Sequence, residues 1–315
     1  MFGFLIRRLA TAIPTLILIS IFVFVLQKLL PGDPALVLAG EERDPELIAF
    51  IREKYRFNDP IIYQYFHWLG AVLQGDFGIS LRTKQPVLEL ILLKIPVTVQ
   101  LALMAMVIAI LIALPMGVIA AVKKNTVFDY IANISALTGL SIPNFWLGIM
   151  LILLFSVTLQ WLPASGYESP FVDPWQSLRS TILPAFVLGT SLAGSLMRHI
   201  RSSMLSTLKA DYVRTARSKG LTEHAVIIKH ALRNALVPVV TIVTLSFGDL
   251  LAGAVLTEQI FSIPGFGKLT VDAVFNRDYA VVQGVVLFAA IAVIFMGALG
   301  DLLYSFLNPK IRVKS

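Results

Sequence analysis

The chain has 315 residues, of which 57% are hydrophobic and 14% are charged, and its net charge is +7. Soluble globular domains carry about 25% charged residues. The lower charged fraction of this chain and its mean hydropathy of +0.81 therefore exclude an ordinary soluble fold. Cysteine is absent, which excludes a disulfide framework, a thiolate zinc site and a cysteine nucleophile. The basic residues flank apolar runs, which is typical of membrane orientation, and we expect no nucleic-acid partner.

Six apolar runs along the chain match the length needed to cross a hydrocarbon layer of about 30 Å. The first follows Arg7 and Arg8 and exceeds the apolar core of a cleaved signal peptide, about 7–15 residues, so we expect an uncleaved span. In the third run, Ser141-Ile142-Pro143 predicts a bend, or the end of one segment and the start of another. The fold class is therefore all-α, a polytopic bundle of six transmembrane helices, at residues 9–30, 97–122, 131–161, 181–197, 236–257 and 281–307.

The spans divide the chain into an N-terminal transmembrane helix (1–30), an extracytoplasmic segment (31–96), a five-helix core (97–307) and a tail (308–315). Short basic segments favour the cytoplasmic side of a membrane. This rule places both termini and the polar loop 198–235 in the cytoplasm, because the same side holds Arg7, Arg8, Lys123, Lys124, Lys310, Arg312 and Lys314.

The polar loop is the most informative stretch of the sequence. From Arg198 to Asn234 it holds eight basic residues against two acidic ones. Gly220 follows a helix-forming segment and fits a C-cap or a tight turn, and a second short helix is expected to run to Asn234. The charge alone would also suit a solvated loop that only fixes topology, so the order of the residues has to decide.

That order resembles the cytoplasmic "EAA" loop of ABC importer permeases, in the form used by peptide and nickel permeases. The pattern is Asp-Tyr-x-x-Thr-Ala-x-x-Lys-Gly, followed by Arg-Asn-Ala-x-x-Pro. Arg214 stands where the general pattern has Glu, which separates the chain from sugar and amino-acid permeases. The matching residues are Asp211, Tyr212, Thr215, Ala216, Lys219, Gly220, Arg233, Asn234, Ala235 and Pro238.

Two further motifs carry the same resemblance. One is Gln74-Gly75-Asp76-Phe77-Gly78-Ile79-Ser80, and the other combines Pro264-Gly265-Phe266-Gly267 with Arg277-Asp278-Tyr279. The resemblance implies a bacterial inner-membrane importer with a second permease subunit, two cytoplasmic ATPase domains and an extracytoplasmic substrate-binding protein. ATP and Mg would bind the ATPase partners, so this chain would be neither an enzyme nor a cofactor carrier.

The resemblance also implies roles in the loop. Gly220 would permit the turn, and Ala216 would keep the helix face small enough to seat in an ATPase groove. Arg217, Lys219 and Arg233 would contact the partner or lipid headgroups. The expected ATPase-coupling residues are therefore Asp211, Tyr212, Arg214, Thr215, Ala216, Arg217, Lys219, Gly220, Arg233 and Asn234.

The candidate transport pathway centres on Asp249, an acid within the fifth span. At helical spacing it shares a face with Ser246, Gly253 and Thr257. A carboxylate is costly against lipid, so this stripe would line the pathway or make a structural contact between helices. Gln100 and Asn133 are weaker candidates, since amides commonly bond across transmembrane helices. Glu258 and Asp301 lie near span ends, where a boundary role is favoured.

No catalytic or metal site is expected. The four histidines lack the spacing of a ligand set, and Gly265-Phe266-Gly267-Lys268 lacks the first glycine and the Ser or Thr of a phosphate loop. The predicted function is import of di- or oligopeptides, with a nickel or metal chelate or glutathione as alternative cargo. A secondary carrier driven by an ion gradient is the alternative from another class.

Overall fold

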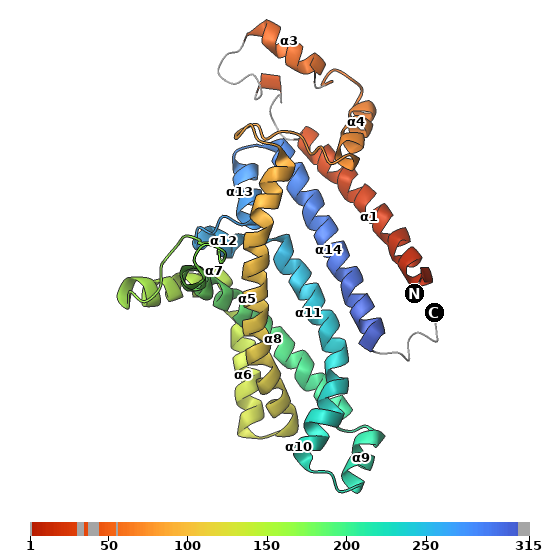
Figure 1. Cartoon of the computed structure of the whole chain (residues 1–315), viewed down its shortest axis with the longest axis vertical. Coiled ribbons are helices and arrows are strands. Elements are labelled where there is room, and N and C mark those ends of the chain that lie inside the picture. The colour runs from red at the N-terminus through yellow and green to blue at the C-terminus, as the bar shows by residue number, and fades with distance from the viewer. Residues whose placement is uncertain (1, 30–34, 37–43, 55, 308–315) are drawn as a thin grey trace. The chain divides into compact units, whose positions relative to one another are not determined.

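The computed structural model describes residues 2–29, 35–36, 44–54 and 56–307. Over this part of the chain the secondary structure is helical, and one isolated bridge joins Ile79 to Pro86. Figure 1 labels the helices in chain order. The chain divides into two compact units: unit 1 holds residues 1–95 and 269–291, and unit 2 holds 96–268 and 292–315. The predicted all-α class is confirmed.

Each predicted span corresponds to a helical element. Four continuous stretches are long and apolar enough to cross a membrane: α5 (Val87–Val122), α8 (Pro174–Thr207), residues Glu223–Ala252, and Tyr279–Ser305 of α14 (Tyr279–Leu307). A fifth is a bent pair, and the first predicted span corresponds to α1 (Phe2–Leu29), whose apolar part is Ala10–Val25. The chain is therefore a polytopic membrane protein.

The third predicted span is broken at the predicted place. Helix α6 (Val127–Ser141) ends at Ile142, and α7 (Asn144–Leu151) begins after Pro143 and continues as a π-helical segment, η1 (Ile152–Thr158). The two arms are bent by 95°. Proline cannot donate a backbone hydrogen bond and restricts the residue before it, which explains why the helix stops here.

Helix α5 begins at Val87 and passes through Pro96, so the predicted start at residue 97 comes too late. In unit 1, Val87 and Ile91 are fully buried. A Cβ on Gly284 of α14 would lie 2.6 Å from Val87 Cγ1, so the α14 backbone packs directly on this turn of α5. Burial of these apolar side chains favours the helix despite the hydrogen bond lost at Pro96.

Unit 1 also holds α3 (Pro45–Lys54) and α4 (Ile61–Leu73). Helix α4 packs on α1 through Tyr65, whose ring lies 5.5 Å from that of Phe24 at an angle of 72°. The Tyr65 hydroxyl and Ser20 Oγ share a hydrogen bond of 2.8 Å. Edge-to-face rings with a satisfied hydroxyl suit a membrane interface.

Unit 2 is held together by small residues. Ala105, Ala109 and Ala113 on one face of α5 are completely buried. A Cβ on Gly189 of α8 would lie 2.9 Å from the Ala105 carbonyl oxygen. Small side chains let the backbones of membrane helices approach closely, so α5 and α8 pack tightly at this level.

The fifth span ends earlier than predicted. Helix α11 (Arg233–Gly253) stops at Ala254, whose ψ of 51° leaves the helical region, and the short helices α12 (Val255–Ile260) and α13 (Phe266–Phe275) follow. Helix α12 packs on α7, where a Cβ on Gly148 would lie 3.2 Å from the Phe261 ring. The run to residue 257 is therefore two helices and not one.

Candidate functional site

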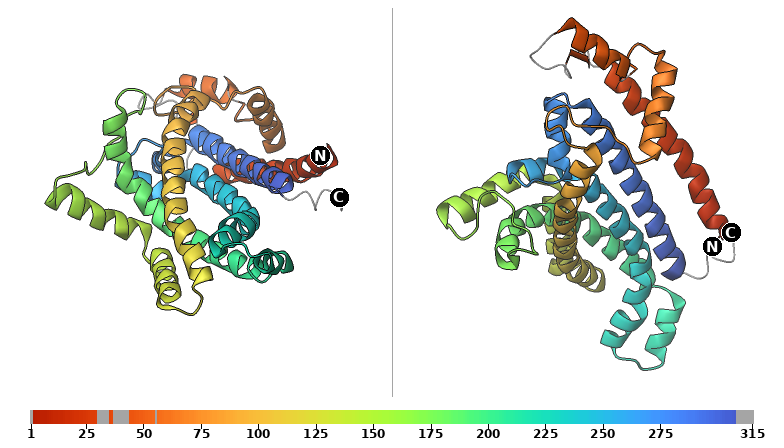
Figure 2. Two further views of the ribbon diagram at one scale, coloured as in Figure 1. Left: turned by 60° about the horizontal axis from the view of Figure 1, so that its bottom comes forward. Right: turned by 45° about the horizontal axis from the view of Figure 1, so that its top comes forward.

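The basic loop is a compact projection at one end of unit 2. Helix α9 (Asp211–Ser218) follows α8 after three residues, and α10 (Glu223–Ala225) follows the turn at Gly220. Figures 1 and 2 show α9 and α10 side by side at this end. Gly220 has a φ of +78° and open space around its Cβ position. The turn therefore needs the left-handed conformation that glycine adopts without strain.

The loop has a small hydrophobic core of its own. Val213 and Ala216 of α9 pack on Val226, and these side chains are 0%, 5% and 0% exposed. Ala216 therefore faces the interior of the loop in this chain, and its part in seating the helix in an ATPase groove stays a prediction. Ala216 is small because α9 lies directly on the following π-helical segment, η2 (Val226–Leu232).

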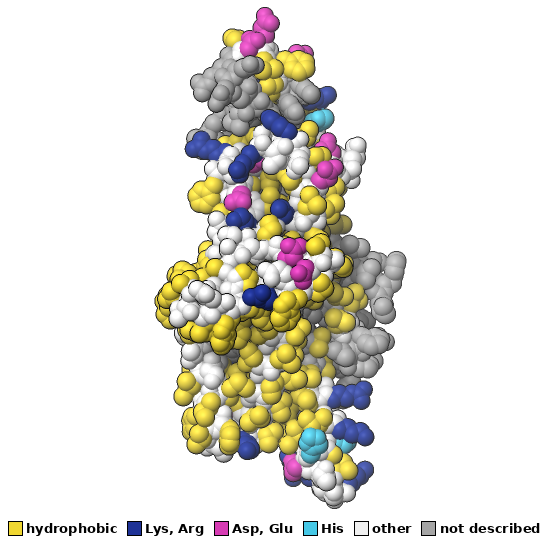
Figure 3. Space-filling model, turned by 60° about the vertical axis from the view of Figure 1, so that its left-hand side comes forward, with side chains coloured by type: hydrophobic (Ala, Val, Ile, Leu, Met, Phe, Trp, Pro, Cys, Tyr) yellow, Lys and Arg dark blue, Asp and Glu magenta, His cyan; other side chains and the backbone are white. Residues whose placement is uncertain are grey.

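The outer face of the loop is charged. Arg217 Nε donates to Glu223 Oε1 at 2.7 Å and closes the turn, while Arg214 lies 3.6 Å from Asp211 with both side chains largely exposed. Figure 3 shows dark blue basic side chains and cyan histidines at this end, next to a broad yellow surface. Predicted residues exposed on this face are Asp211, Tyr212, Arg214, Thr215, Arg217, Lys219 and Gly220.

Substitution at the Arg217–Glu223 ion pair tests what holds the loop together. Both side chains are well exposed, so their ion pair contributes about 0.2–1 kcal/mol. We expect Glu223→Gln to leave the protein level in the membrane unchanged and to lower the thermal unfolding temperature by no more than about 2 °C. A large loss of folded protein would show that this pair, and not the Val213–Ala216–Val226 core, holds the loop.

The second helix of the loop does not end at Asn234. Residues 223–253 are one continuous helix formed by α10, η2 and α11, and it passes through Pro238. Arg233 and Asn234 are exposed on it, and Asn234 Nδ2 donates to the His230 carbonyl at 2.9 Å. Ser203 Oγ of α8 donates to the Ala235 carbonyl at 2.7 Å. The loop therefore lies at the end of α8 and α11, two transmembrane helices joined there by this hydrogen bond.

The predicted pathway stripe is divided by the break at Ala254. Asp249 is exposed on α11, Ser246 is partly buried, and Gly253 is the last residue of that helix. Thr257 lies in α12 and is 3% exposed. Among the described residues, no hydrogen bond or ion pair is made to the Asp249 carboxylate. The structure thus leaves Asp249 at the surface of the single chain and separates it from Thr257.

Gln100 and Asn133 both take part in hydrogen bonds. Gln100 Nε2 donates to Ser177 Oγ, and its Oε1 accepts from Tyr167 Oη, each at 2.8 Å. Asn133 Nδ2 donates to Asp129 Oδ1 at 2.7 Å. Gln100 therefore links α5 to α8 and to the loop before it, while Asn133 belongs to a polar cluster on α6.

Glu258, which the sequence analysis placed at a span end with a boundary role, is a fully buried carboxylate. Glu258 is 0% exposed. Its Oε1 accepts from Thr98 Oγ1 and its Oε2 from the Lys268 amide, both at 2.8 Å, while Thr98 Oγ1 accepts from the Phe266 amide. Burial raises the pKa of the Glu258 carboxyl above its ordinary value, and the hydrogen bonds oppose this shift only in part. Glu258 thus anchors the turn between α12 and α13 onto α5.

The glycines of that turn are explained by the same carboxylate. A Cβ on Gly265 would lie 2.4 Å from Glu258 Oε1, and one on Gly267 would lie 3.1 Å from Oε2. Real Cβ atoms essentially never approach within 3.0 Å, so a side chain at Gly265 would clash with the carboxylate, and one at Gly267 would be tight against it. Glycine at both positions lets the backbone pass close to the acid. The signal in the sequence was the pair of glycines seven and nine residues after an acid.

A second buried acid joins two of the motifs in unit 1. Asp278 is 4% exposed, and its carboxylate accepts hydrogen bonds from Ser80 Oγ and from the amides of Leu81 and Arg82. The Arg277-Asp278-Tyr279 motif therefore holds the segment that follows Gly75-Asp76-Phe77-Gly78. Residues nearly two hundred positions apart were matched separately in the sequence, and their contact could not be foreseen.

We expect Asp278→Ala to release the segment around residues 80–86. Buried donors left without an acceptor cost about 1–3 kcal/mol, so trypsin should cleave the detergent-purified protein at Arg82 and Lys84 about tenfold faster. Asp272→Ala, six residues earlier on α13, serves as the control. Equal cleavage rates in the two variants would contradict the role of Asp278.

The third buried acid is Asp129 in the first turn of α6, which pairs with Arg201 of α8. Neither residue was a candidate, although Asn133, one turn further on, was. Across the described residues, no group of three or more His, Asp and Glu side chains is placed to hold a metal ion. The two buried acids of unit 2, Asp129 and Glu258, thus accept hydrogen bonds from protein groups: a guanidinium, a hydroxyl, a side-chain amide and backbone amides.

Comparison with known proteins places the chain in a family. Residues 113–313 match the family described as binding-protein-dependent transport system inner membrane component, and residues 1–102 match the N-terminal family of the same systems. The dipeptide transport system permease protein DppB of Escherichia coli K12 is 44% identical over 338 aligned residues, covering all of both chains. The glutathione transport system permease protein GsiC of Salmonella choleraesuis is 42% identical and also fully covered.

A putative peptide transport system permease protein of Brucella abortus is 44% identical over 99% of each chain. Among solved structures, an inward-facing form of the MetNI methionine ABC transporter superposes with a TM-score of 0.58 at 16% identity, covering 70% of this chain and 96% of that one. This likeness shows a shared fold. The matched models and full-length relatives show that the chain belongs to the family of binding-protein-dependent transport system inner membrane components.

Proposed function

We propose that this chain is the permease subunit of an ATP-binding-cassette importer that carries di- or oligopeptides across the bacterial inner membrane. The observation that carries the proposal is the loop at residues 198–235. It is a compact, basic, two-helix projection, and both of its ends continue directly into transmembrane helices. The peptide permeases among the full-length relatives support the substrate class.

The loop suits the transmission of force. Its core of Val213, Ala216 and Val226 keeps α9 and η2 together, and Ser203 ties the two helical arms to each other. An ATPase subunit that moves α9 would therefore move α8 and α11 with it. The exposed residues Tyr212, Arg214 and Lys219 would form the contact with that subunit, while the loop interior stays packed.

The other subunits of the proposed importer are separate from this chain. A second permease subunit, two ATPase domains that bind ATP and Mg, and an extracytoplasmic binding protein would complete it, with both termini of this chain in the cytoplasm. Asp249 is exposed on a spanning helix. Because a carboxylate is costly against lipid, we assign it to the watered pathway. Ser246 would share that path.

Glutathione is the second candidate substrate, because the 42% identical relative is named as a glutathione permease. Glutathione is itself a modified tripeptide, so the two candidates share their chemistry. Competition for uptake between labelled dipeptide and excess glutathione, in the reconstituted complex, separates them. Loss of labelled dipeptide uptake in the presence of excess glutathione would favour the second candidate.

The proposal predicts a specific defect for Gly220→Trp. The Cβ position is open, so the chain should insert normally, but an indole at a φ of +78° strains the turn and projects into the expected ATPase contact. Uptake per ATP hydrolysed should fall by about tenfold or more. Gly220→Asn is the matched control, since asparagine tolerates this conformation, and it should retain most of the uptake.

Both variants are compared at equal amounts of assembled complex in proteoliposomes. Normal uptake by Gly220→Trp would remove the loop from the coupling mechanism. A parallel loss in Gly220→Asn would show that the turn geometry, and not contact with the ATPase, limits transport.

A further inference from the structure

Asp129 and Arg201 form an ion pair between α6 and α8 whose role neither the loop nor the pathway residues explain. Asp129 is 3% exposed. Its Oδ1 accepts from Arg201 Nε at 2.7 Å and its Oδ2 from Arg201 Nη2 at 2.8 Å, a two-pronged contact. Asn133 and the Asn125 amide supply two further hydrogen bonds. The carboxylate is thus satisfied from all sides and held in one position.

Stability alone does not account for such a pair. An apolar pair of similar volume is often at least as stable as a buried ion pair, while a planar guanidinium and a carboxylate specify one geometry. Here that geometry fixes α6 against α8 at the end of α6 that begins the span. The ion pair therefore fixes the position of the start of α6 relative to α8.

The rest of α6 is equally fixed on α8. A Cβ on Gly194 of α8 would lie 2.6 Å from the Ala136 carbonyl oxygen, and a Cβ on Gly139 of α6 would lie 2.9 Å from the Thr190 carbonyl oxygen. The backbones therefore touch at two levels above the ion pair. Sliding of α6 along α8 would bring these backbone atoms into steric clash, so the packing favours movement of the two helices together.

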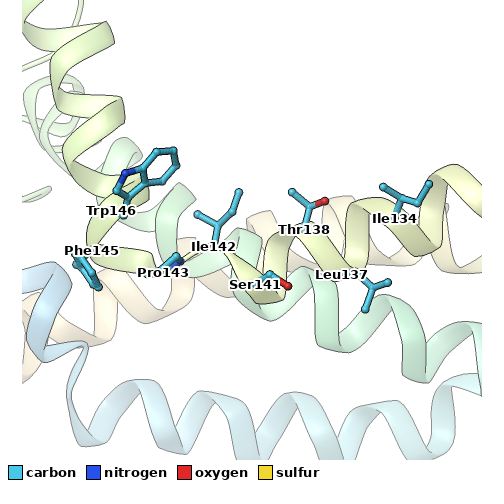
Figure 4. Close-up of a pocket in the computed structure, with 8 residues that line it drawn as sticks. All are labelled: Ile134, Leu137, Thr138, Ser141, Ile142, Pro143, Phe145 and Trp146. Carbon is cyan, nitrogen blue, oxygen red and sulfur yellow. The ribbon is translucent and has the colours of Figure 1, made fainter.

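The other end of α6 is different. Beyond Ile142 and Pro143 the chain turns by 95° into α7. Figure 4 shows the hollow at this elbow, with Ile134 and Thr138 on one arm and Phe145 and Trp146 on the other. The hollow measures about 600 Å³. Space between the arms, and a proline without an amide hydrogen at the corner, allow the angle to change.

We propose that Asp129 and Arg201 are positioning residues for transport: they make α6 follow α8, so that a displacement of the loop reaches the elbow at Ile142–Pro143. Helix α8 leads to α9 through residues 208–210 alone, so movement of the loop is movement of α8. This inference rests on the proposed coupling function of the loop. It adds which transmembrane element receives the motion and where the chain bends.

The first test replaces the pair by neutral amides in the reconstituted importer. Arg201→Ala alone would leave an unpaired buried carboxylate and lower the protein level, so the informative variant is Asp129→Asn combined with Arg201→Gln. We expect normal assembly and binding-protein-stimulated ATP hydrolysis, with peptide uptake per ATP reduced about tenfold. Tyr130→Phe, exposed on α6 next to Asp129, is the control and should transport normally.

The second test measures motion and needs no disruptive substitution. Because the chain has no cysteine, spin labels can be placed by Tyr130→Cys on α6, Ser202→Cys on α8 and Val157→Cys on η1, all exposed positions. Between nucleotide-free and ATP-trapped complexes, the 130–202 distance should stay constant while the 130–157 distance changes.

The outcomes separate the two proposals. A wild-type complex without ATP-dependent uptake would overturn the proposed function itself. A working wild type, together with normal uptake per ATP in the double amide variant or a 130–202 distance that changes as much as the 130–157 distance, would overturn only the role of the ion pair.

Discussion

Glu258→Ala should destabilise the protein more than any other single substitution considered. It leaves the Thr98 hydroxyl and the Lys268 amide without their acceptor inside a closed turn, and it opens a cavity where the side chain was 0% exposed. Each unsatisfied buried donor costs about 1–3 kcal/mol. We expect a total loss of about 3 kcal/mol and a thermal unfolding temperature about 5 °C lower in detergent.

Two controls make this result specific. Glu258→Gln keeps the shape and one carbonyl acceptor, so it should lose less than half as much. Gln259→Ala removes an exposed neighbour and should be close to neutral. Equal unfolding temperatures for Glu258→Ala and Gln259→Ala would show that the turn between α12 and α13 is held by its apolar contacts alone.

Gly194→Ala should separate α6 from α8. The added Cβ would lie 2.6 Å from the Ala136 carbonyl oxygen and 3.0 Å from Leu140 Cγ, and backbone cannot move aside as a flexible side chain can. Overpacking of this kind costs about 1–3 kcal/mol. The amount of folded protein recovered from membranes should fall, and so should its unfolding temperature.

The matched control is the same substitution at Gly70 of α4, where nothing lies within 4 Å of the Cβ position. There alanine relieves the backbone entropy of glycine in a helix, and the protein should become up to about 1 kcal/mol more stable. If Gly194→Ala behaved like Gly70→Ala, the close packing of α6 on α8 would be contradicted.

Apolar runs and helix-breaking residues predicted the transmembrane helices well, because a span is defined by its length and its apolar composition. The break at Ile142–Pro143 was predicted from a local rule for proline. The same rule would interrupt a helix at Pro96 and at Pro238, yet α5 continues through Pro96 and α11 through Pro238. Both prolines are exposed, but Val97 and Thr98 beside Pro96 and Ala235 and Val239 beside Pro238 are buried. The packing of these neighbours offsets the missing backbone hydrogen bond.

The buried acids mark the limit of inference from the sequence. Glu258 was expected at a boundary and Asp129 was overlooked, because nothing local distinguishes an acid that accepts three or four hydrogen bonds from a solvated one. Their partners, Thr98 and Arg201, are distant in the chain. Ala216 shows the same limit, since the motif identified the residue but only the packing on Val226 explains its size.

The most direct test of the account is ATP hydrolysis and peptide uptake by the complete complex in proteoliposomes, with and without peptide-loaded binding protein. We predict that the loaded binding protein stimulates hydrolysis, and that uptake requires ATP and persists when ion gradients are dissipated. Uptake that continues without an ATPase subunit and collapses with the proton or sodium gradient would contradict the account, and would make the exposed Asp249 an ion-coupling residue.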